Sequence, residues 1–324
     1  MFGDKITQIS VVSIPMRVAF RGLRHREALI FRGTERWAEF SPFIEYRDEE
    51  AARWLASAIS FANEPLPKLN RTKIGINATL PALPISELKK TLERFGEFQT
   101  LKLKIAEAGQ SLAADLERIH YLAEHYPNVR LRLDANGALS VAMAKQLVMQ
   151  LTEFNIDYLE QPVSSIAEMV ELRRFIAEMN LNILIAADEL IRKAEDPLLV
   201  SQQKAADVVM LKVQPLGGIA SALRISEQAG LPTVVSSALE TSIGISQGLY
   251  LAASLEELNY DCGLGTLNLL EGDVCERPLI PENGFLEVRE VEPSTRLLSE
   301  FAADPARTSW WLERLERCHR LLEA

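Results

Sequence analysis

Lysines and carboxylates suited to acid–base and metal chemistry recur through residues 100–218. Each of them ends or directly follows a short apolar run, and about one strand plus one helix separates each group from the next. Parallel strands that alternate with helices deliver such residues to one end of a barrel, where the loops gather. We therefore expect one site built from six side chains: Lys102, Lys104, Asp134, Glu160, Asp188 and Lys212.

The three carboxylates of this set, Asp134, Glu160 and Asp188, predict a metal site. Ionised carboxylates brought close together in a partly dry site repel one another strongly. A divalent cation relieves that repulsion, and ligands that are all oxygen favour a hard ion, with Mg²⁺ first and Mn²⁺ second. Any one of the three could be a surface carboxylate near a loop, but three in register after apolar runs favour the metal.

The lysines predict proton transfer. Lys102 and Lys104 are two residues apart on an expected strand, so both point to the same face, and Lys212 is expected across the barrel mouth. The plain alternative is a solvated pair at a strand edge. An ammonium near a second ammonium and a metal ion has its charged form disfavoured, so its pKa falls toward that of a general base. We expect these groups to hold a substrate carboxylate while its α-carbon loses a proton, which gives an enediolate.

The elements that position these residues predict an α/β fold, a (β/α)7β TIM-like barrel with an α+β capping domain. From Lys73 onward strands and helices alternate strictly, which implies parallel strands with right-handed crossovers. We expect a capping domain over residues 1–72 with a basic loop at 17–26, a barrel over 73–280, and a tail over 281–324 that packs on the cap. The expected barrel strands are 74–80, 101–105, 129–133, 157–160, 183–187, 208–212, 233–235 and a closing strand near 264–270.

Composition narrows the class of protein. The hydrophobic share of 48% allows a core large enough for a barrel of about 250 residues plus a smaller domain. The net charge of -10 argues against a nucleic-acid partner. Without an apolar run of membrane-spanning length or a signal peptide, we expect no membrane contact and a cytoplasmic protein. Three cysteines without metal spacing are expected to be unpaired thiols: Cys262, Cys275 and Cys318.

The arrangement Lys-x-Lys, Asp, Glu, Asp and Lys on consecutive barrel strands resembles the enolase superfamily, muconate-lactonising subgroup. A Lys base with Mg²⁺ and an ene-diolate is the known chemistry of that superfamily. Residues 131–136, 235–244 and 263–267 are similar to the dehydratases of this subgroup that act in menaquinone biosynthesis. The resemblance implies a hydro-lyase that removes water from 2-succinyl-6-hydroxy-2,4-cyclohexadiene-1-carboxylate by syn elimination and forms 2-succinylbenzoate.

The resemblance also implies individual roles. Lys104 would remove the α-proton and return it to the departing hydroxyl, Lys102 would help to hold the enediolate, and Lys212 would stabilise it from the opposite face. The cap departs from the usual Gly-Trp-Gly-Glu, since residues 36–39 read Arg-Trp-Ala-Glu. The small-molecule carboxylate substrate would be bordered by Arg26, Arg132, Ser236, Ser237, Gly263 and Gly265.

Other functions stay open to different degrees. An N-acylamino acid racemase would use Lys104 and Lys212 as opposed bases, and both are present. A dipeptide epimerase is disfavoured because residues 261–264 lack an Asp-x-Asp pair, and a mandelate-racemase-type enzyme is excluded because no histidine ends an expected barrel strand. A silent binding protein would have lost one of the six groups, and the Gly217-Gly218 pair lacks the rest of a phosphate loop. The sequence does not predict an oligomeric state.

Overall fold

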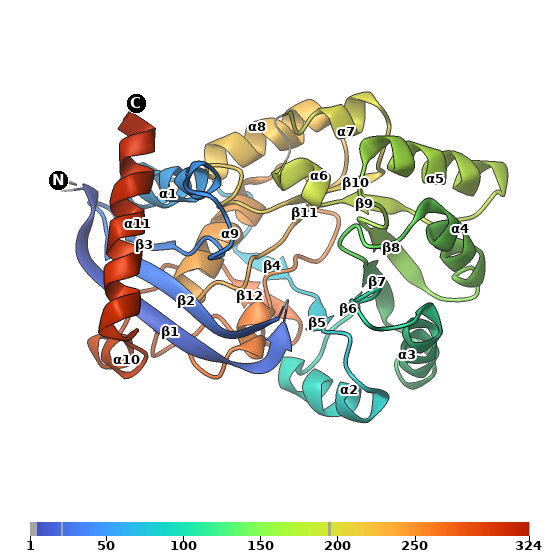
Figure 1. Cartoon of the computed structure of the whole chain (residues 1–324), viewed down its shortest axis with the longest axis horizontal. Coiled ribbons are helices and arrows are strands. Elements are labelled where there is room, and N and C mark those ends of the chain that lie inside the picture. The colour runs from blue at the N-terminus through green and yellow to red at the C-terminus, as the bar shows by residue number, and fades with distance from the viewer. Residues whose placement is uncertain (1–4, 21, 194–195, 324) are drawn as a thin grey trace.

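A seven-stranded parallel sheet forms the centre of the computed structural model, which describes residues 5–20, 22–193 and 196–323 (Figure 1). Strands that are neighbours in sequence are neighbours in the sheet, as the strict alternation of strands and helices predicts. The strands are β5 (Ala78–Leu80), β6 (Thr100–Lys104), β7 (Arg130–Asp134), β8 (Ile156–Glu160), β9 (Ile185–Ala187), β10 (Val208–Leu211) and β11 (Thr233–Val235).

Among the residues that the structure describes, Cys262 and Gly263 close the sheet into a barrel. Gly263 forms a parallel bridge with Ser236 beyond β11, and Cys262 forms one with Ile76 ahead of β5. The Gly263 amide donates to the Val235 carbonyl at 2.8 Å, and the Cys262 amide donates to Gly75 at 2.7 Å. The closing strand expected at 264–270 is therefore wrong in position: that segment carries a 3-10 helix, η3 (Thr266–Leu269).

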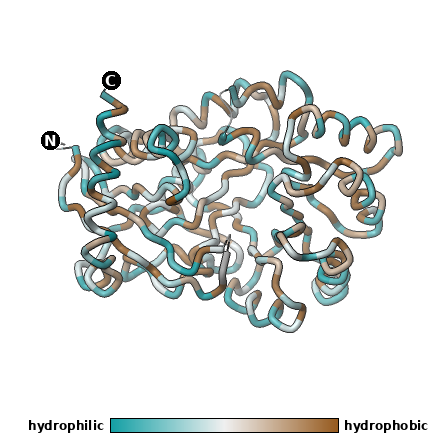
Figure 2. The backbone as a smooth tube through the Cα atoms, viewed as in Figure 1, coloured by the Kyte–Doolittle hydropathy of each residue, from teal (hydrophilic) through white to brown (hydrophobic). Residues whose placement is uncertain are grey.

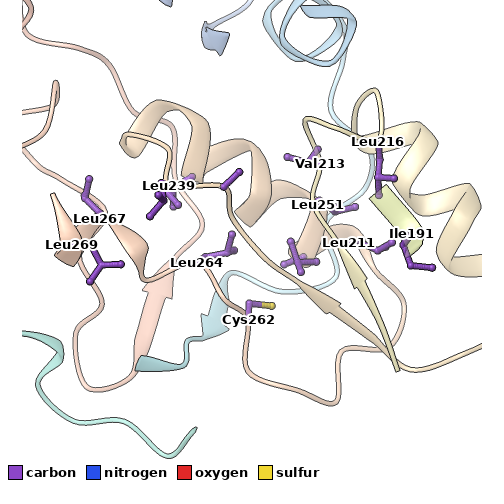
Figure 3. Close-up of a cluster of buried hydrophobic side chains, with 14 of the residues drawn as sticks. Ile191, Leu211, Val213, Leu216, Leu239, Leu251, Cys262, Leu264, Leu267 and Leu269 are labelled. Atoms are coloured by element: carbon purple, nitrogen blue, oxygen red, sulfur yellow. The ribbon is translucent and has the colours of Figure 1, made fainter. Parts of the chain in front are cut away.

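The apolar run that suggested a strand at 264–270 reflects burial instead. Leu264, Leu267 and Leu269 are all buried and pack in one cluster with Leu239 and Cys262 (Figure 3). A short apolar run does not by itself distinguish a strand from another buried segment.

Helices surround the barrel (Figure 1). Several begin at a serine whose side chain accepts a backbone amide of the first turn, and Ser165 with Glu168 forms a complete capping box. Figure 2 shows hydrophobic residues along the central strands and hydrophilic ones on the outer turns of the peripheral helices. The helices are α2 (Ile85–Leu92), η2 (Glu93–Phe95), α3 (Leu112–His125), α4 (Val141–Gln150), α5 (Ile166–Glu178), α6 (Glu189–Arg192), α7 (Leu199–Gln202), α8 (Ile219–Ala229) and α9 (Ser242–Ser254).

The cap begins with an antiparallel sheet of β1 (Thr7–Phe20), β2 (Leu23–Arg32) and β3 (Trp37–Phe40), covered by α1 (Asp48–Asn63). The basic loop expected at 17–26 is wrong, because β1 and β2 extend through most of it as a hairpin. Arg26 is buried, whereas Arg24 and His25, which lie nearer the turn of the hairpin, are exposed. Of these three basic residues of β2, only Arg26 has its charge buried.

The C-terminal segment runs back over the cap (Figure 1). Its strand β12 (Phe285–Glu287) pairs antiparallel with β4 (Lys73–Gly75), and the helices α10 (Thr295–Glu300) and α11 (Pro305–Glu323) follow. On α11, the buried Trp311 donates its indole N–H to Glu27 of β2 at 2.8 Å, and Arg314 donates to the Tyr46 carbonyl at 2.5 Å. Both ends of the chain thus contribute to the cap.

Two further observations concern membrane spans and cysteines. Among the described residues, no helix combines the length and apolar character needed to cross a bilayer. The cysteines are unpaired and buried, as the sequence predicts.

Candidate active site

A cavity lies between the cap and the C-terminal ends of the barrel strands. The cap supplies aromatic side chains to one wall, and the barrel strands and their loops supply the polar groups. This is the end of a barrel at which sites are built. Its lining includes Phe43, Tyr46, Trp54, Thr79, Lys102, Lys104, Asn136, Glu189, Arg192, Lys212, Pro215, Ser236, Ser237, Ala238, Leu239, Gly263 and Thr266.

The two lysines of β6 point into this cavity together. The Lys102 ammonium lies 2.6 Å from Glu160 Oε1 and 2.9 Å from Asp134 Oδ2. The Lys104 ammonium contacts the same Asp134 oxygen and donates to Asn136 Oδ1 at 2.6 Å. In the parallel register Lys104 lies beside Asp134, and Asp134 lies beside Glu160, which explains how three adjacent strands bring these groups together.

Lys212 and Asp188 form a second ion pair across the mouth. Lys212 directly follows β10, Asp188 directly follows β9, and the ammonium lies 2.5 Å from Asp188 Oδ2. The other Asp188 oxygen faces Arg192 of α6 at 3.3 Å. Gln161 fixes the backbone here, because its side-chain oxygen accepts the Asp188 amide at 3.0 Å. The six side chains expected from their spacing thus gather at one end of the barrel.

The two lysines of β6 have pKa values shifted in opposite directions. Burial lowers the pKa of Lys104, and the charge of Lys102 adds to this effect. Burial also disfavours the charge on Lys102, but the attraction of Asp134 and Glu160 outweighs it and raises the pKa well above normal. Lys104 is therefore the lysine that releases its proton more readily, as a general base requires.

The donor set fits a hard divalent cation. Within the described part of the chain, no three acidic, histidine or cysteine side chains are arranged as metal ligands as they lie; Lys102 and Lys212 contact the carboxylates instead. Yet Glu160 Oε2 and Asp188 Oδ1 are buried without a hydrogen-bond partner. Burial and the charge of Asp134 raise the pKa of Glu160 to about 8, so its negative charge is under-compensated. Buried carboxylate oxygens in this state are what Mg²⁺ or Mn²⁺ binds.

The predicted substrate-binding residues separate into two groups. Ser236, Ser237 and Gly263 line the cavity, whereas Gly265 precedes η3 and faces Ile76 and Asn77. A Cβ on Gly263 would meet Ser236 Oγ at 2.7 Å, so close approach of the two segments requires glycine there.

Arg26 and Arg132 do not line the cavity. Arg132 is buried in the barrel interior below the site and donates to Asp157 at 2.8 Å and to the Asp261 carbonyl at 2.6 Å. Its side chain faces inward like that of Asp134, but one layer further from the mouth. Arg26 donates to backbone carbonyls, including that of Leu239 at 3.0 Å. The expectation that these two arginines border the substrate is corrected accordingly.

The cavity also includes residues that sequence reasoning did not single out. Asn136 accepts from Lys104 and donates to Glu189 Oε1 at 3.2 Å. Asn136 lies two residues after Asp134, and Glu189 directly follows Asp188. Arg192 lies one helical turn after Asp188, which is a spacing that could have pointed to it. The cap residues Tyr46 and Trp54 carried no such signal, because only the folded cap brings them over the barrel.

Comparisons with known proteins agree with this geometry. The family model described as enolase C-terminal domain-like matches residues 85–293, and the one described as enolase N-terminal domain-like matches residues 11–62. The o-succinylbenzoate synthase of Mycobacterium ulcerans (strain Agy99) is 45% identical over 320 residues, which cover 98% of this chain and 95% of that protein. This chain belongs to the o-succinylbenzoate synthase family of the enolase superfamily. A second o-succinylbenzoate synthase, from Mycobacterium tuberculosis (strain ATCC 25618 / H37Rv), is also 45% identical, over 318 residues with the same coverage.

Solved structures extend the likeness of this o-succinylbenzoate synthase family member to its fold. Muconate lactonizing enzyme from Pseudomonas fluorescens, complexed with muconolactone, matches with a TM-score of 0.77 at 22% identity and covers 92% of this chain and 99% of that chain. The enzyme from Pseudomonas putida matches with a TM-score of 0.76 at 20% identity and the same coverage. The superfamily, the subgroup and the fold class predicted from sequence are confirmed.

A buried carboxylate of the cap, Glu39, meets the barrel beside this site. Its Oε2 accepts the Thr241 amide at 3.0 Å, the Thr241 hydroxyl at 2.6 Å and the Gly244 amide at 3.1 Å, all at the start of α9. Burial, reinforced by the neighbouring Glu240 carboxylate, raises the pKa of Glu39 to about 7, although Arg26 opposes the shift.

This raised pKa predicts a pH-dependent stability. Between about pH 4.5 and 7 the folded protein keeps the Glu39 proton that the unfolded chain releases, so the free energy of unfolding falls as pH rises. The loss is about 3 kcal/mol. Between pH 5 and pH 8, the loss measured by urea unfolding should be about 3 kcal/mol smaller in Glu39→Gln than in the wild type, and the exposed Glu153→Gln should behave like the wild type. Equal pH dependence in wild type and Glu39→Gln would mean that Glu39 titrates normally.

Proposed function

We propose that this protein catalyses the syn dehydration of 2-succinyl-6-hydroxy-2,4-cyclohexadiene-1-carboxylate to 2-succinylbenzoate, as an o-succinylbenzoate synthase of menaquinone biosynthesis. Identity of 45% over nearly the full length of o-succinylbenzoate synthases is the observation that carries the assignment. The cavity adds the chemistry: lysines and carboxylates converge at the barrel mouth under an aromatic cap wall.

The metal belongs to the proposal. Asp134, Glu160 and Asp188 would hold Mg²⁺ or Mn²⁺, and the Glu160 oxygen that is buried without a hydrogen-bond partner supports this assignment. When bound, the cation would act as a Lewis acid toward the substrate carboxylate and so make the adjacent proton more acidic.

The protein groups account for the proton steps. Lys104 takes the proton from the α-carbon at its Nζ, which its lowered pKa favours, and returns it to the leaving hydroxyl on the same face. Lys102, whose raised pKa keeps it charged, neutralises the carboxylate oxygens as they gain charge. Lys212 supplies a second positive charge from β10, across the cavity from β6. The aromatic residues Tyr46 and Trp54 of the cap exclude water from the ring.

A direct assay tests this function. Purified protein with Mg²⁺ and the cyclohexadiene substrate should form the aromatic product, which can be followed by the absorbance change on aromatisation. N-acylamino acid racemisation is the second candidate, since Lys104 and Lys212 both line the cavity and could act as opposed bases. Fast racemisation of N-succinylamino acids without turnover of the cyclohexadiene would replace the proposed function by that one. Chelation by EDTA should abolish turnover, and added Mg²⁺ should restore it.

A further inference from the structure

The loop that follows β11 forms one wall of the cavity in an unfavourable backbone conformation. Residues 236–239 of this loop line the cavity, and residues 240–241 lead into α9. Leu239 has a φ of 66°, in the left-handed region that residues with a Cβ rarely adopt. Such a conformation persists only where surrounding contacts hold it. The source of those contacts lies in the cap.

Arg26 of β2 is the first of them. The side chain is 3% exposed, and it donates from Nε to the Leu239 carbonyl at 3.0 Å and from Nη2 to the Ala238 carbonyl at 3.2 Å. Its guanidinium lies 4.7 Å from the ring centre of Phe43, another residue of the cavity wall. A planar guanidinium can satisfy two successive carbonyls at once, which a lysine cannot reproduce. The cap thus contacts the loop at Leu239, the residue with the unfavourable backbone conformation.

Glu39 of β3 is the second contact. It accepts two backbone amides and a hydroxyl at the start of α9, a position where the helix leaves its amides without intrahelical partners. The carboxylate therefore caps a barrel helix from another domain, and Gly244 leaves room for it, since a Cβ there would lie 2.9 Å from Glu39 Oε2. Ser41 connects Arg26 with Glu39, because its hydroxyl accepts from Arg26 at 3.0 Å and donates to Glu39 at 2.6 Å.

We propose that Arg26 and Glu39 are positioning residues that hold residues 236–241 in the conformation that shapes the substrate cavity. The inference rests on the proposed function, since it assigns this loop to the part of the substrate beyond the carboxylate held by the lysines. That part is the succinyl side chain, a flexible keto acid. A loop free to relax would leave the proton-transfer groups of β6 in place but would bind the succinyl group less well.

The test compares Arg26→Lys with a matched control. Arg36 is also a cap arginine, donates to the Phe61 and Glu64 carbonyls and lies 5.3 Å from the centre of an aromatic ring, but its hydrogen bonds stay inside the cap. In Arg26→Lys, KM for the cyclohexadiene substrate should rise about tenfold while kcat changes less than about threefold. Amide hydrogen exchange over residues 238–244 should accelerate at least about tenfold. Arg36→Lys should change neither quantity.

A milder variant keeps the inference testable if Arg26→Lys fails to fold. Ser41→Ala removes the hydroxyl between Arg26 and Glu39, and exchange over 238–244 should accelerate about threefold in it. If amide exchange over residues 238–244 is unchanged in both variants, Arg26 and Glu39 do not hold the loop in place. If exchange is faster but KM is unchanged, the loop has no role in substrate binding. A wild-type protein without dehydratase activity would refute the proposed function separately, because the exchange comparison needs no substrate.

Discussion

Replacement of Lys104 by alanine should lower kcat for dehydration by roughly 10²- to 10⁴-fold, the range that one positioned acid–base group supplies. The upper part of that range is expected, because Lys104 acts first as the base and then as the acid. Its ammonium contacts Asp134 and Asn136, and burial lowers its pKa, which suits it to both proton transfers. The measurement is the rate of product formation at saturating substrate and Mg²⁺.

The controls for this prediction separate chemistry from folding. Lys145→Ala on α4 removes a half-buried ammonium paired with Glu171 away from the cavity and should leave kcat unchanged. The circular dichroism of Lys104→Ala should match that of the wild type, since its smaller side chain relieves a buried charge. Added alkylamines of suitable size should restore part of the rate in this variant. Near-normal turnover in Lys104→Ala would show that another group is the base.

Replacement of Glu160 by glutamine is the second change with a large expected effect. Loss of one carboxylate should weaken Mg²⁺ binding and lower kcat/KM by roughly 10²- to 10³-fold, because the cation contributes several kcal/mol to stabilising the developing charge. Glu160 is the sharpest choice, since one of its oxygens is buried without a hydrogen-bond partner and its pKa is raised to about 8.

Stability provides a readout that does not depend on turnover. A cation that binds only the folded protein stabilises it by about 2.7 kcal/mol at one hundred times its dissociation constant. Wild-type protein should therefore melt at a higher temperature in Mg²⁺ than in EDTA, and Glu160→Gln should lose most of that difference. Each protein is compared with itself in EDTA and in Mg²⁺, because the substitution also removes the Lys102 ion pair of Glu160 and so changes the stability without metal. A Mg²⁺-dependent shift of wild-type size in Glu160→Gln would remove this carboxylate from the metal site.

Strand periodicity carried most of what could be predicted. Because residues two apart on a strand share a face, Lys102 and Lys104 could be placed together, and the recurrence of one strand plus one helix placed Asp134, Glu160 and Asp188 at the same end. Parallel register then fixed their proximity. These inferences depend on local geometry, which the sequence reports directly.

Contacts between distant segments were beyond that reach. Arg132 lies beside Lys102 in the sheet, but its side chain donates to Asp157 and to the Asp261 carbonyl, and these contacts with distant residues keep it out of the cavity wall. The sequence showed that Arg26 is basic, but it did not show where the side chain points. Only the folded structure reveals that Arg26 donates from β2 to the Leu239 carbonyl. The short closing segment at Cys262 and Gly263 had too few residues to give any periodicity.

The shared construction of the cap has a consequence for synthesis of the protein on the ribosome. Ser13 of the first strand donates its amide to the Phe301 carbonyl at 2.8 Å, and Trp311 meets Glu27. The barrel residues emerge before this partner segment, so a nascent chain holds its lysines and carboxylates at a mouth whose cover is incomplete. The cap thus gains its last packing partner only with the final helix, and a truncated chain should carry exposed apolar cap surface that chaperones and proteases recognise.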